Sequence, residues 1–170
     1  MPAPPGGSTA PRSCSRPRCP IWFWARALVA ASAGDFETAE RVAVQAVETH
    51  PHNGVLRNNL AVLHELAGAL PQAEELARAA LQDEPSLPQL SKNLGDLAYR
   101  GSRYDEAWAL YQRAIELSPE LGDDIYFKLG NIAYKRNERD QASELWRRAL
   151  ELNPKHELVK ANLDTLSSLS

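Results

Sequence analysis

Apolar side chains between residues 88 and 119 recur with the spacing of two short amphipathic helices. The first segment places them at offsets of three and four residues, at Leu90, Leu94, Leu97 and Ala98. Gly101 interrupts this pattern, and a second segment of the same spacing runs over residues 104–117 until Pro119, which a helix cannot continue past. The stretch therefore predicts two helices joined by a tight turn. A lone hairpin of this size leaves one apolar face uncovered, so it needs neighbours of its own kind.

The same pattern returns at a fixed interval along the chain. Proline recurs at steps of 34, 34 and 35 residues, at Pro51, Pro85, Pro119 and Pro154. Alanine keeps this register twice, at Ala39, Ala73, Ala107 and Ala142 and again at Ala46, Ala80, Ala114 and Ala149. Leucine follows it at Leu60, Leu94 and Leu129. Four columns in one register indicate an array of repeats in which each unit packs on the next.

Two units carry a further set of residues in phase. In the third unit these are Leu94, Gly95, Tyr99, Ala107, Tyr111 and Pro119. In the fourth they are Leu129, Gly130, Tyr134, Ala142, Trp146 and Pro154, with Tyr126 at the start of the first helix. This set resembles the tetratricopeptide repeat, whose pattern has a Leu-Gly pair, an aromatic residue, a small residue, a second aromatic and a closing proline. The departures are Arg26 and Ala27 in the Leu-Gly columns of the first unit, and His64 and Glu65 in place of the aromatic in the second.

The resemblance implies an all-α fold, namely a right-handed superhelical α-α solenoid of about four helix-turn-helix repeats with a C-terminal capping helix. The expected domain covers residues 20–169. Its repeats are expected at residues 20–53, 54–87, 88–122 and 123–156, with a one-residue insertion near Gly122. Residues 157–169 look like the first helix of a fifth repeat without its partner, which is how such arrays are capped.

Residues 1–19 are rich in proline, glycine and serine, so they are predicted to form a disordered tail. Residues 1–33 also imitate a secretory signal, with arginines before an apolar run. However, Arg26 interrupts that run, which lies in phase with the later first helices. A cytoplasmic protein is therefore expected, and export, for instance to the periplasm, is the alternative.

Composition and motifs argue against most chemistry. The net charge is −3, with 44% hydrophobic and 24% charged residues, so neither nucleic acid nor an anionic membrane is expected as partner. No nucleophile motif, phosphate-binding glycine loop or HExxH pair occurs, and neither an enzyme, a cofactor nor a small-molecule substrate is expected. Cys14, Cys19, His50 and His52 lack the spacing of a structural zinc site, so no metal is expected either.

Stacked helical hairpins of this type form a concave wall from their first helices, and extended partners bind there. The resemblance places the following residues on that wall: Asn58, Asn59, Lys92, Asn93, Asp96, Arg100, Phe127, Lys128, Asn131, Lys135 and Asn162. An asparagine amide both donates and accepts hydrogen bonds, which suits the backbone of an extended peptide. The later half of the wall would be mildly basic, through Lys92, Arg100, Lys128 and Lys135, and tempered by Asp96 and Asp124. A peptide with some acidic character is therefore expected. The alternative is that these polar side chains only face water.

Two kinds of interaction protein fit these expectations. One is a free-standing scaffold or adaptor that binds a protein or peptide segment. The other is a docking or regulatory module of a larger, bacterial enzyme or secretion system. The family's clamp for chaperone tails is not expected, because Trp24 and Leu28 stand at two of its lysine and asparagine positions. Trp22 and Trp24, within a run of aromatic residues, predict self-association through the first helix; the alternative is that these rings fold back onto the array.

Overall fold

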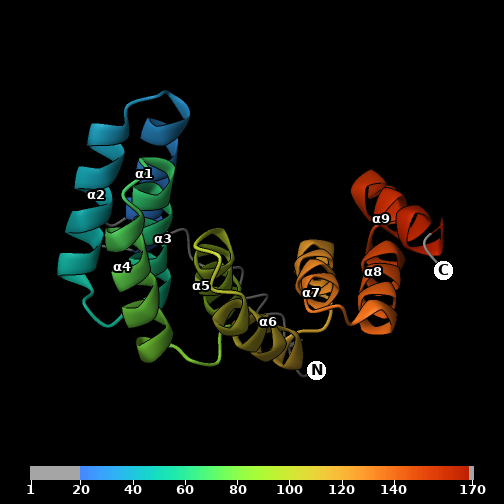
Figure 1. Cartoon of the computed structure of the whole chain (residues 1–170). Coiled ribbons are helices and arrows are strands. Elements are labelled where there is room, and N and C mark those ends of the chain that lie inside the picture. The colour runs from blue at the N-terminus through green and yellow to red at the C-terminus, as the bar shows by residue number, and fades with distance from the viewer. Residues whose placement is uncertain (1–19, 169–170) are drawn as a thin grey trace, which may run out of the picture.

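The computed structural model describes residues 20–168 and places them in nine α-helices without a strand. The helices are α1 (Pro20–Ser32), α2 (Phe36–Thr49), α3 (Gly54–Leu66), α4 (Leu70–Asp83), α5 (Pro88–Arg100), α6 (Tyr104–Leu117), α7 (Asp123–Lys135), α8 (Arg139–Leu152) and α9 (Glu157–Ser168). Successive hairpins follow one another from α1 at one end to α9 at the other (Figure 1). The predicted all-α solenoid is confirmed. The predicted tail, with Cys14 and Cys19, lies outside the described residues.

Each hairpin turns through one residue with a left-handed backbone, in step with the repeat. These residues are Gly34 (φ 80°), Gly68 (φ 78°), Ser102 (φ 59°) and Asn137 (φ 63°). In the third repeat the N–H of Arg103 donates to the carbonyl of Ala98 over 2.9 Å, which closes the end of α5. Gly101, which marks this turn in the sequence, keeps a φ of −75°. The left-handed position is therefore one residue later than the glycine.

The two helices of a hairpin match each other in side-chain size. A Cβ on Gly95 would lie 2.8 Å from the ring of Tyr111, and a Cβ on Gly130 would lie 2.4 Å from that of Trp146. In the first two repeats the corresponding pairs are alanine with alanine: Ala27 with Ala43, and Ala61 with Ala77. The missing glycine of the first repeat is thus accommodated, because its second helix brings no ring to that position.

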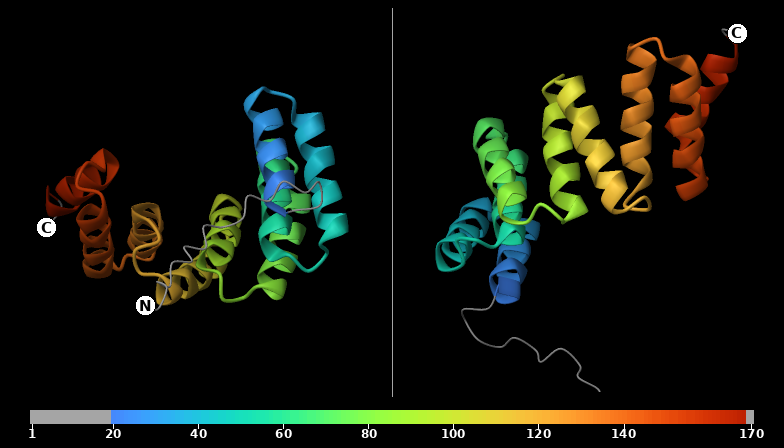
Figure 2. Two further views of the ribbon diagram at one scale, coloured as in Figure 1. Left: turned by 180° about the vertical axis from the view of Figure 1, so that it is seen from behind. Right: turned by 90° about the horizontal axis from the view of Figure 1, so that it is seen from below.

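A second contact stacks each first helix on the second helix of the preceding repeat. One apolar position of the first helix is buried by this contact in each later unit: its exposure is 6% at Leu63, 7% at Leu97, 0% at Ile132 and 8% at Leu166. The matching residue of α1 is Val29, which is 68% exposed. The upstream face of α1 therefore has, within the described part of the chain, no helix packed over it at this position (Figure 2).

The two ends of the array differ in character. In α1, Phe23 and Ala27 are buried in an apolar cluster with Val42 of α2 and Leu60 of α3, here called the first core cluster. Trp24 is partly buried against this cluster, whereas Leu28 is exposed. The side chain of Trp22 lies outside the described ones. In α9, the position equivalent to Gly130 holds Asp164, which is exposed. The surface of α9 is thus polar where α7 receives a tryptophan ring.

Candidate functional site

The predicted wall residues lie on α3, α5, α7 and α9, and the surface to which these helices contribute them is here called the groove face. Asn93 Nδ2 of α5 donates to Asn58 Oδ1 of α3 over 3.0 Å, and Asn93 Oδ1 accepts from Gln89 Nε2 over 2.7 Å. Asn58 is buried, at 6% exposure. The amides of these two asparagines therefore join neighbouring helices, and Asn58 is withdrawn from the exposed surface. Asn59 is partly buried beside it.

Lys92, Asp96, Asp124 and Lys128 form a compact charged cluster between α5 and α7. Lys92 Nζ lies 3.2 Å from Asp96 and 2.8 Å from Asp124, while Lys128 Nζ lies 2.6 Å from Asp96 and 3.3 Å from Asp124. Asp96 also accepts a hydrogen bond of 2.7 Å from the buried phenol of Tyr111. Two lysines meet two aspartates here, so the middle of the groove face is electrically neutral instead of mildly basic.

The electrostatics of this cluster follow from partial burial and close opposite charges. Burial alone would raise the pKa of Asp124, but hydrogen bonds and charges from Lys92 and Lys128 hold it below its ordinary value. Burial alone would lower the pKa of Lys92, but the two aspartates raise it. Burial and Asp96 together raise the pKa of the Tyr111 phenol, which therefore stays a hydrogen-bond donor. The ion pairs of the cluster link α5 to α7 and so join successive repeats.

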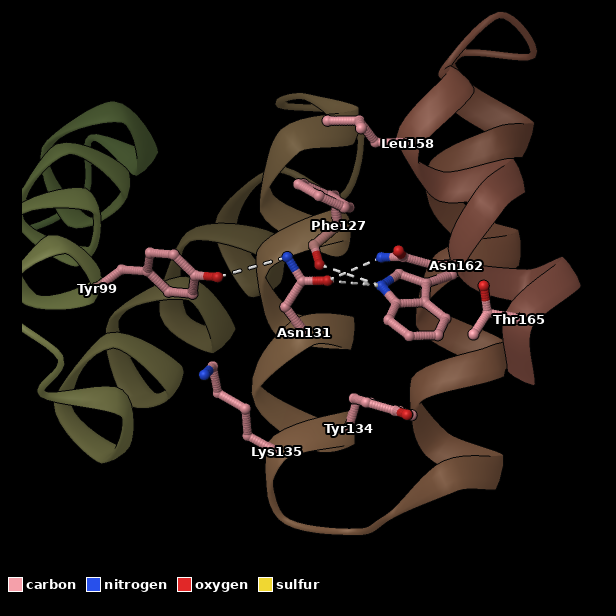
Figure 3. A pocket seen from close by; sticks show the side chains of 9 residues that line it. Tyr99, Phe127, Asn131, Tyr134, Lys135, Leu158, Asn162 and Thr165 are labelled. Carbon is pink, nitrogen blue, oxygen red and sulfur yellow. Dashed lines mark hydrogen bonds between the residues drawn. The ribbon is translucent and has the colours of Figure 1, made fainter. Parts of the chain in front are cut away.

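Asn131 is the centre of a second set of contacts, which joins α5, α7, α8 and α9 (Figure 3). Its Oδ1 accepts from Trp146 Nε1 and from Asn162 Nδ2, each over 3.2 Å. Its Nδ2 lies 3.4 Å from the hydroxyl of Tyr99. The side-chain oxygen of Asn131 thus accepts from two donors. Contacts from α5, α8 and α9 hold its amide group in one orientation.

A hollow of about 500 Å³ opens around Asn131 on the groove face. Its lining residues are Tyr99, Phe127, Asn131, Tyr134, Lys135, Trp146, Leu158, Asn162 and Thr165. The structure thus brings Phe127, Asn131, Lys135 and Asn162 of the predicted set into one pocket. Arg100 lies outside it, paired with Glu65 of α3. The predicted residues therefore divide into a paired region on α3, α5 and the start of α7, and a pocket spanning α5 to α9.

Five pocket residues were not predicted as wall residues, namely Tyr99, Tyr134, Trp146, Leu158 and Thr165. The sequence indicates Tyr99, Tyr134 and Trp146 as residues of the repeat pattern and Leu158 as a residue of the capping helix. Leu158 lies four residues before Asn162 and Thr165 lies three after it, so helical spacing alone puts all three on one face. That spacing was the available signal. The depth of the pocket had no such signal, because it depends on how α9 is placed against α7.

The remaining chemistry of the described residues is sparse. No group of three or more metal-binding side chains occurs among them, and the cysteines of the rejected zinc site lie outside. His50 is packed edge-on against Phe23 with ring centroids 6.4 Å apart, and His52 lies 3.8 Å from Asp83. No helix of residues 20–168 is long and apolar enough to cross a membrane.

Three family models, each described as a tetratricopeptide repeat, match consecutive parts of the chain. They cover residues 30–97, 90–125 and 123–156. The chain belongs to the tetratricopeptide repeat family. A search of curated protein sequences gave no significant match. Tetratricopeptide repeats form protein-interaction scaffolds, and in this chain the repeats together form the hydrogen-bonded groove face described above.

Solved structures of other tetratricopeptide repeat proteins share the fold. A MamA structure has a TM-score of 0.76 and 19% identity, covering 88% of this chain and 81% of that one. The pilF protein of Pseudomonas aeruginosa has a TM-score of 0.77 and 24% identity over 86% of this chain and 67% of that one. YrrB, described as a TPR protein with an unusual peptide-binding site, has a TM-score of 0.73 and 18% identity, covering 89% and 78%. At these identities the likeness concerns the fold.

Proposed function

We propose that this tetratricopeptide repeat protein is a non-catalytic scaffold that binds an extended peptide or protein segment on its groove face. The pocket around Asn131 is the observation that carries the proposal. It is concave, has aromatic walls with a few fixed polar groups, and its volume of about 500 Å³ lies within the range of about 300–1,000 Å³ usual for ligand sites. Its position across α5, α7 and α9 suits a ligand that runs along the array.

The polar groups of the pocket support an extended ligand over a compact one. Trp146 and Asn162 hold the Asn131 amide in place and occupy its oxygen, so a ligand meets a rigid N–H donor without a cost in side-chain order on binding. Asn162 uses an N–H of its amide for that contact, and it also lines the pocket. Rigid amides of this kind suit the backbone of a bound segment. YrrB, which has the same fold, is described as having a peptide-binding site.

A role as a docking or regulatory module of a larger system remains the second candidate. The upstream face of α1 favours it, because Val29 is exposed where the other repeats bury the matching residue. Self-association through α1 would use the same face. Trp24 is partly packed onto the first core cluster, so Leu28 and Val29 would carry most of that contact among the described side chains.

A cytoplasmic location agrees best with the packing of α1. Phe23 and Ala27 belong to the core cluster that also contains Val42 and Leu60. Removal of residues 1–33 as a secretory signal would take both from this cluster and expose its remaining members. The first repeat would then lose one of its two helices.

Selection of short random peptides on the whole chain tests the proposal. The affinity of the best peptide is measured by fluorescence polarisation for the wild type and for Thr165→Trp, which fills the pocket with an indole ring. Gln141→Trp is the matched control, because Gln141 is exposed on α8 and does not line this pocket. We expect Thr165→Trp to weaken binding by about tenfold or more and the control to leave it unchanged. Equal affinity of the two variants contradicts the proposal.

A further inference from the structure

The walls of the pocket around Asn131 are apolar and partly uncovered. Leu158 is 63% exposed and Tyr134 is 40% exposed, although both are large apolar or aromatic side chains. Phe127 lines the same hollow (Figure 3). Its ring packs at a tilt against His156, with the ring centroids 4.8 Å apart. Exposed rings around a hollow gain free energy when a ligand's apolar side chain covers them. The pocket therefore offers a place for one aromatic or branched aliphatic side chain.

The charges around the pocket have one sign. Its nine lining residues include one cation, Lys135, and no aspartate or glutamate. The Nζ of Lys135 lies 5.1 Å from the centre of the Tyr104 ring, and among the described residues no carboxylate lies within ion-pair distance of it. The pocket therefore carries one positive charge that is in no ion pair of the described residues.

Lys135 differs in this respect from the other cations of the groove face. Lys92 and Lys128 share Asp96 and Asp124, and Arg100 is paired with Glu65. Arg136, next to Lys135 in the chain, is paired with Asp105. An acidic ligand gains little at these paired cations, because it would have to displace a carboxylate already in place. Selection for acidic character is therefore concentrated at the pocket.

We propose that the pocket recognises a peptide segment in which an apolar side chain enters between Phe127, Tyr134 and Leu158 and a nearby aspartate or glutamate pairs with Lys135. This inference rests on the proposed function and names its ligand class. In an extended segment, side chains two residues apart point to the same side and are spaced by roughly 6–7 Å. The acidic residue is therefore within about two positions of the apolar one. Paired cations elsewhere on the groove face contribute little to this selectivity.

The test repeats the peptide selection on the wild type, on Lys135→Glu and on Lys155→Glu. Lys155 is an exposed lysine of the turn before α9 and does not line the pocket. Both variants replace a lysine by a glutamate, so they change the net charge equally. We expect wild-type peptides to combine an apolar anchor with Asp or Glu, and Lys135→Glu to select Lys or Arg at that position instead. A wild-type peptide should bind Lys135→Glu about tenfold more weakly, since an attraction is replaced by a repulsion, and should bind Lys155→Glu unchanged.

A further variant, Lys135→Met, keeps most of the apolar stem and removes the charge, and circular dichroism checks that each variant is folded. Its affinity for the wild-type peptide should lose most of the dependence on ionic strength that the wild type shows. If peptides are selected without acidic preference and bind Lys135→Glu equally well, the charge selectivity is overturned while peptide binding stands. If no peptide is selected by the wild type, both proposals are overturned.

Discussion

The indole ring of Trp146 packs directly over the backbone of Gly130. A Cβ at this glycine would lie 2.4 Å from both Cδ1 and Nε1 of the ring. The same Nε1 donates to Asn131, so this contact between α7 and α8 also fixes an amide of the candidate site. The packing of one hairpin and the geometry of the pocket therefore depend on the same side chain.

Gly130→Ala should destabilise the protein by about 1–3 kcal/mol, because the buried ring must move and the gain in helix propensity of about 1 kcal/mol offsets only part of the cost. The free energy of unfolding from urea denaturation, followed by circular dichroism, measures this effect. The control is Asp164→Ala, at the equivalent position of α9, because Asp164 is exposed and no following helix packs on it among residues 20–168. If both variants unfold at the same urea concentration, the glycine is not required by the ring.

Ile132 and Val29 occupy the same position in different repeats, and their substitutions should differ sharply. Ile132 is fully buried, so Ile132→Ala should cost about 2–5 kcal/mol. Val29 is 68% exposed, so Val29→Ala should change the free energy of unfolding by no more than about 0.5 kcal/mol. Urea denaturation of both variants measures the contrast. A large loss for Val29→Ala would show that this face of α1 is covered in solution, by a second copy or another part of the protein.

The hydrogen bond from Tyr111 to Asp96 should couple α6 to the charged cluster. Tyr111→Phe removes the hydroxyl, Asp96→Asn removes the charge, and the double variant completes a thermodynamic cycle. We expect a coupling free energy of about 0.5–3 kcal/mol, because the phenol is buried and its acceptor is charged. Unfolding free energies of the four proteins measure it. Additive effects would mean that the bond contributes nothing to stability.

The charged cluster should also set the pH range of stability. The lowered pKa of Asp124 adds stability above its unfolded value of about 4, and this is lost as the pH falls through the folded value. The raised pKa of Lys92 adds stability below its unfolded value of about 10.4, and this is lost as the pH rises through the folded value. Unfolding free energy should therefore be highest between these limits.

Asp124→Asn should flatten the acid side of that pH profile. The Asp124 side chain is 40% exposed, so we expect the effect to be at most about 1 kcal/mol. A series of urea titrations between acidic and neutral pH measures it. Asp140→Asn is the control, since this exposed aspartate of α8 is in none of the ion pairs described. If the free energy of unfolding falls equally steeply with decreasing pH in Asp124→Asn and in the wild type, a role for the cluster is contradicted.

Most of the fold could be predicted from periodicity, because helix faces and repeat stacking use the same residues in every unit. The range predicted for the second helix of the third repeat, residues 104–117, matches α6. The turn was predicted less well, since its left-handed residue is Ser102 and not Gly101. The candidate site was predicted in part: Asn131, Lys135 and Asn162 do line one pocket, whereas Asn58 is buried against Asn93.

The sequence by itself determined that the chain folds as stacked helical hairpins and which side chains stack them, because 3.6-residue periodicity and a repeat of 34 residues are local properties of the chain. The tertiary structure alone decided which polar residues remain available. Lys92 and Lys135 were both predicted from the sequence as cations of the wall, but the first lies 2.8 Å from Asp124 of the next repeat, whereas the second lies 5.1 Å from the centre of the Tyr104 ring and in none of the ion pairs of residues 20–168. Charge pairing depends on distances between residues far apart in the chain, and these are set by how one repeat is placed on the next.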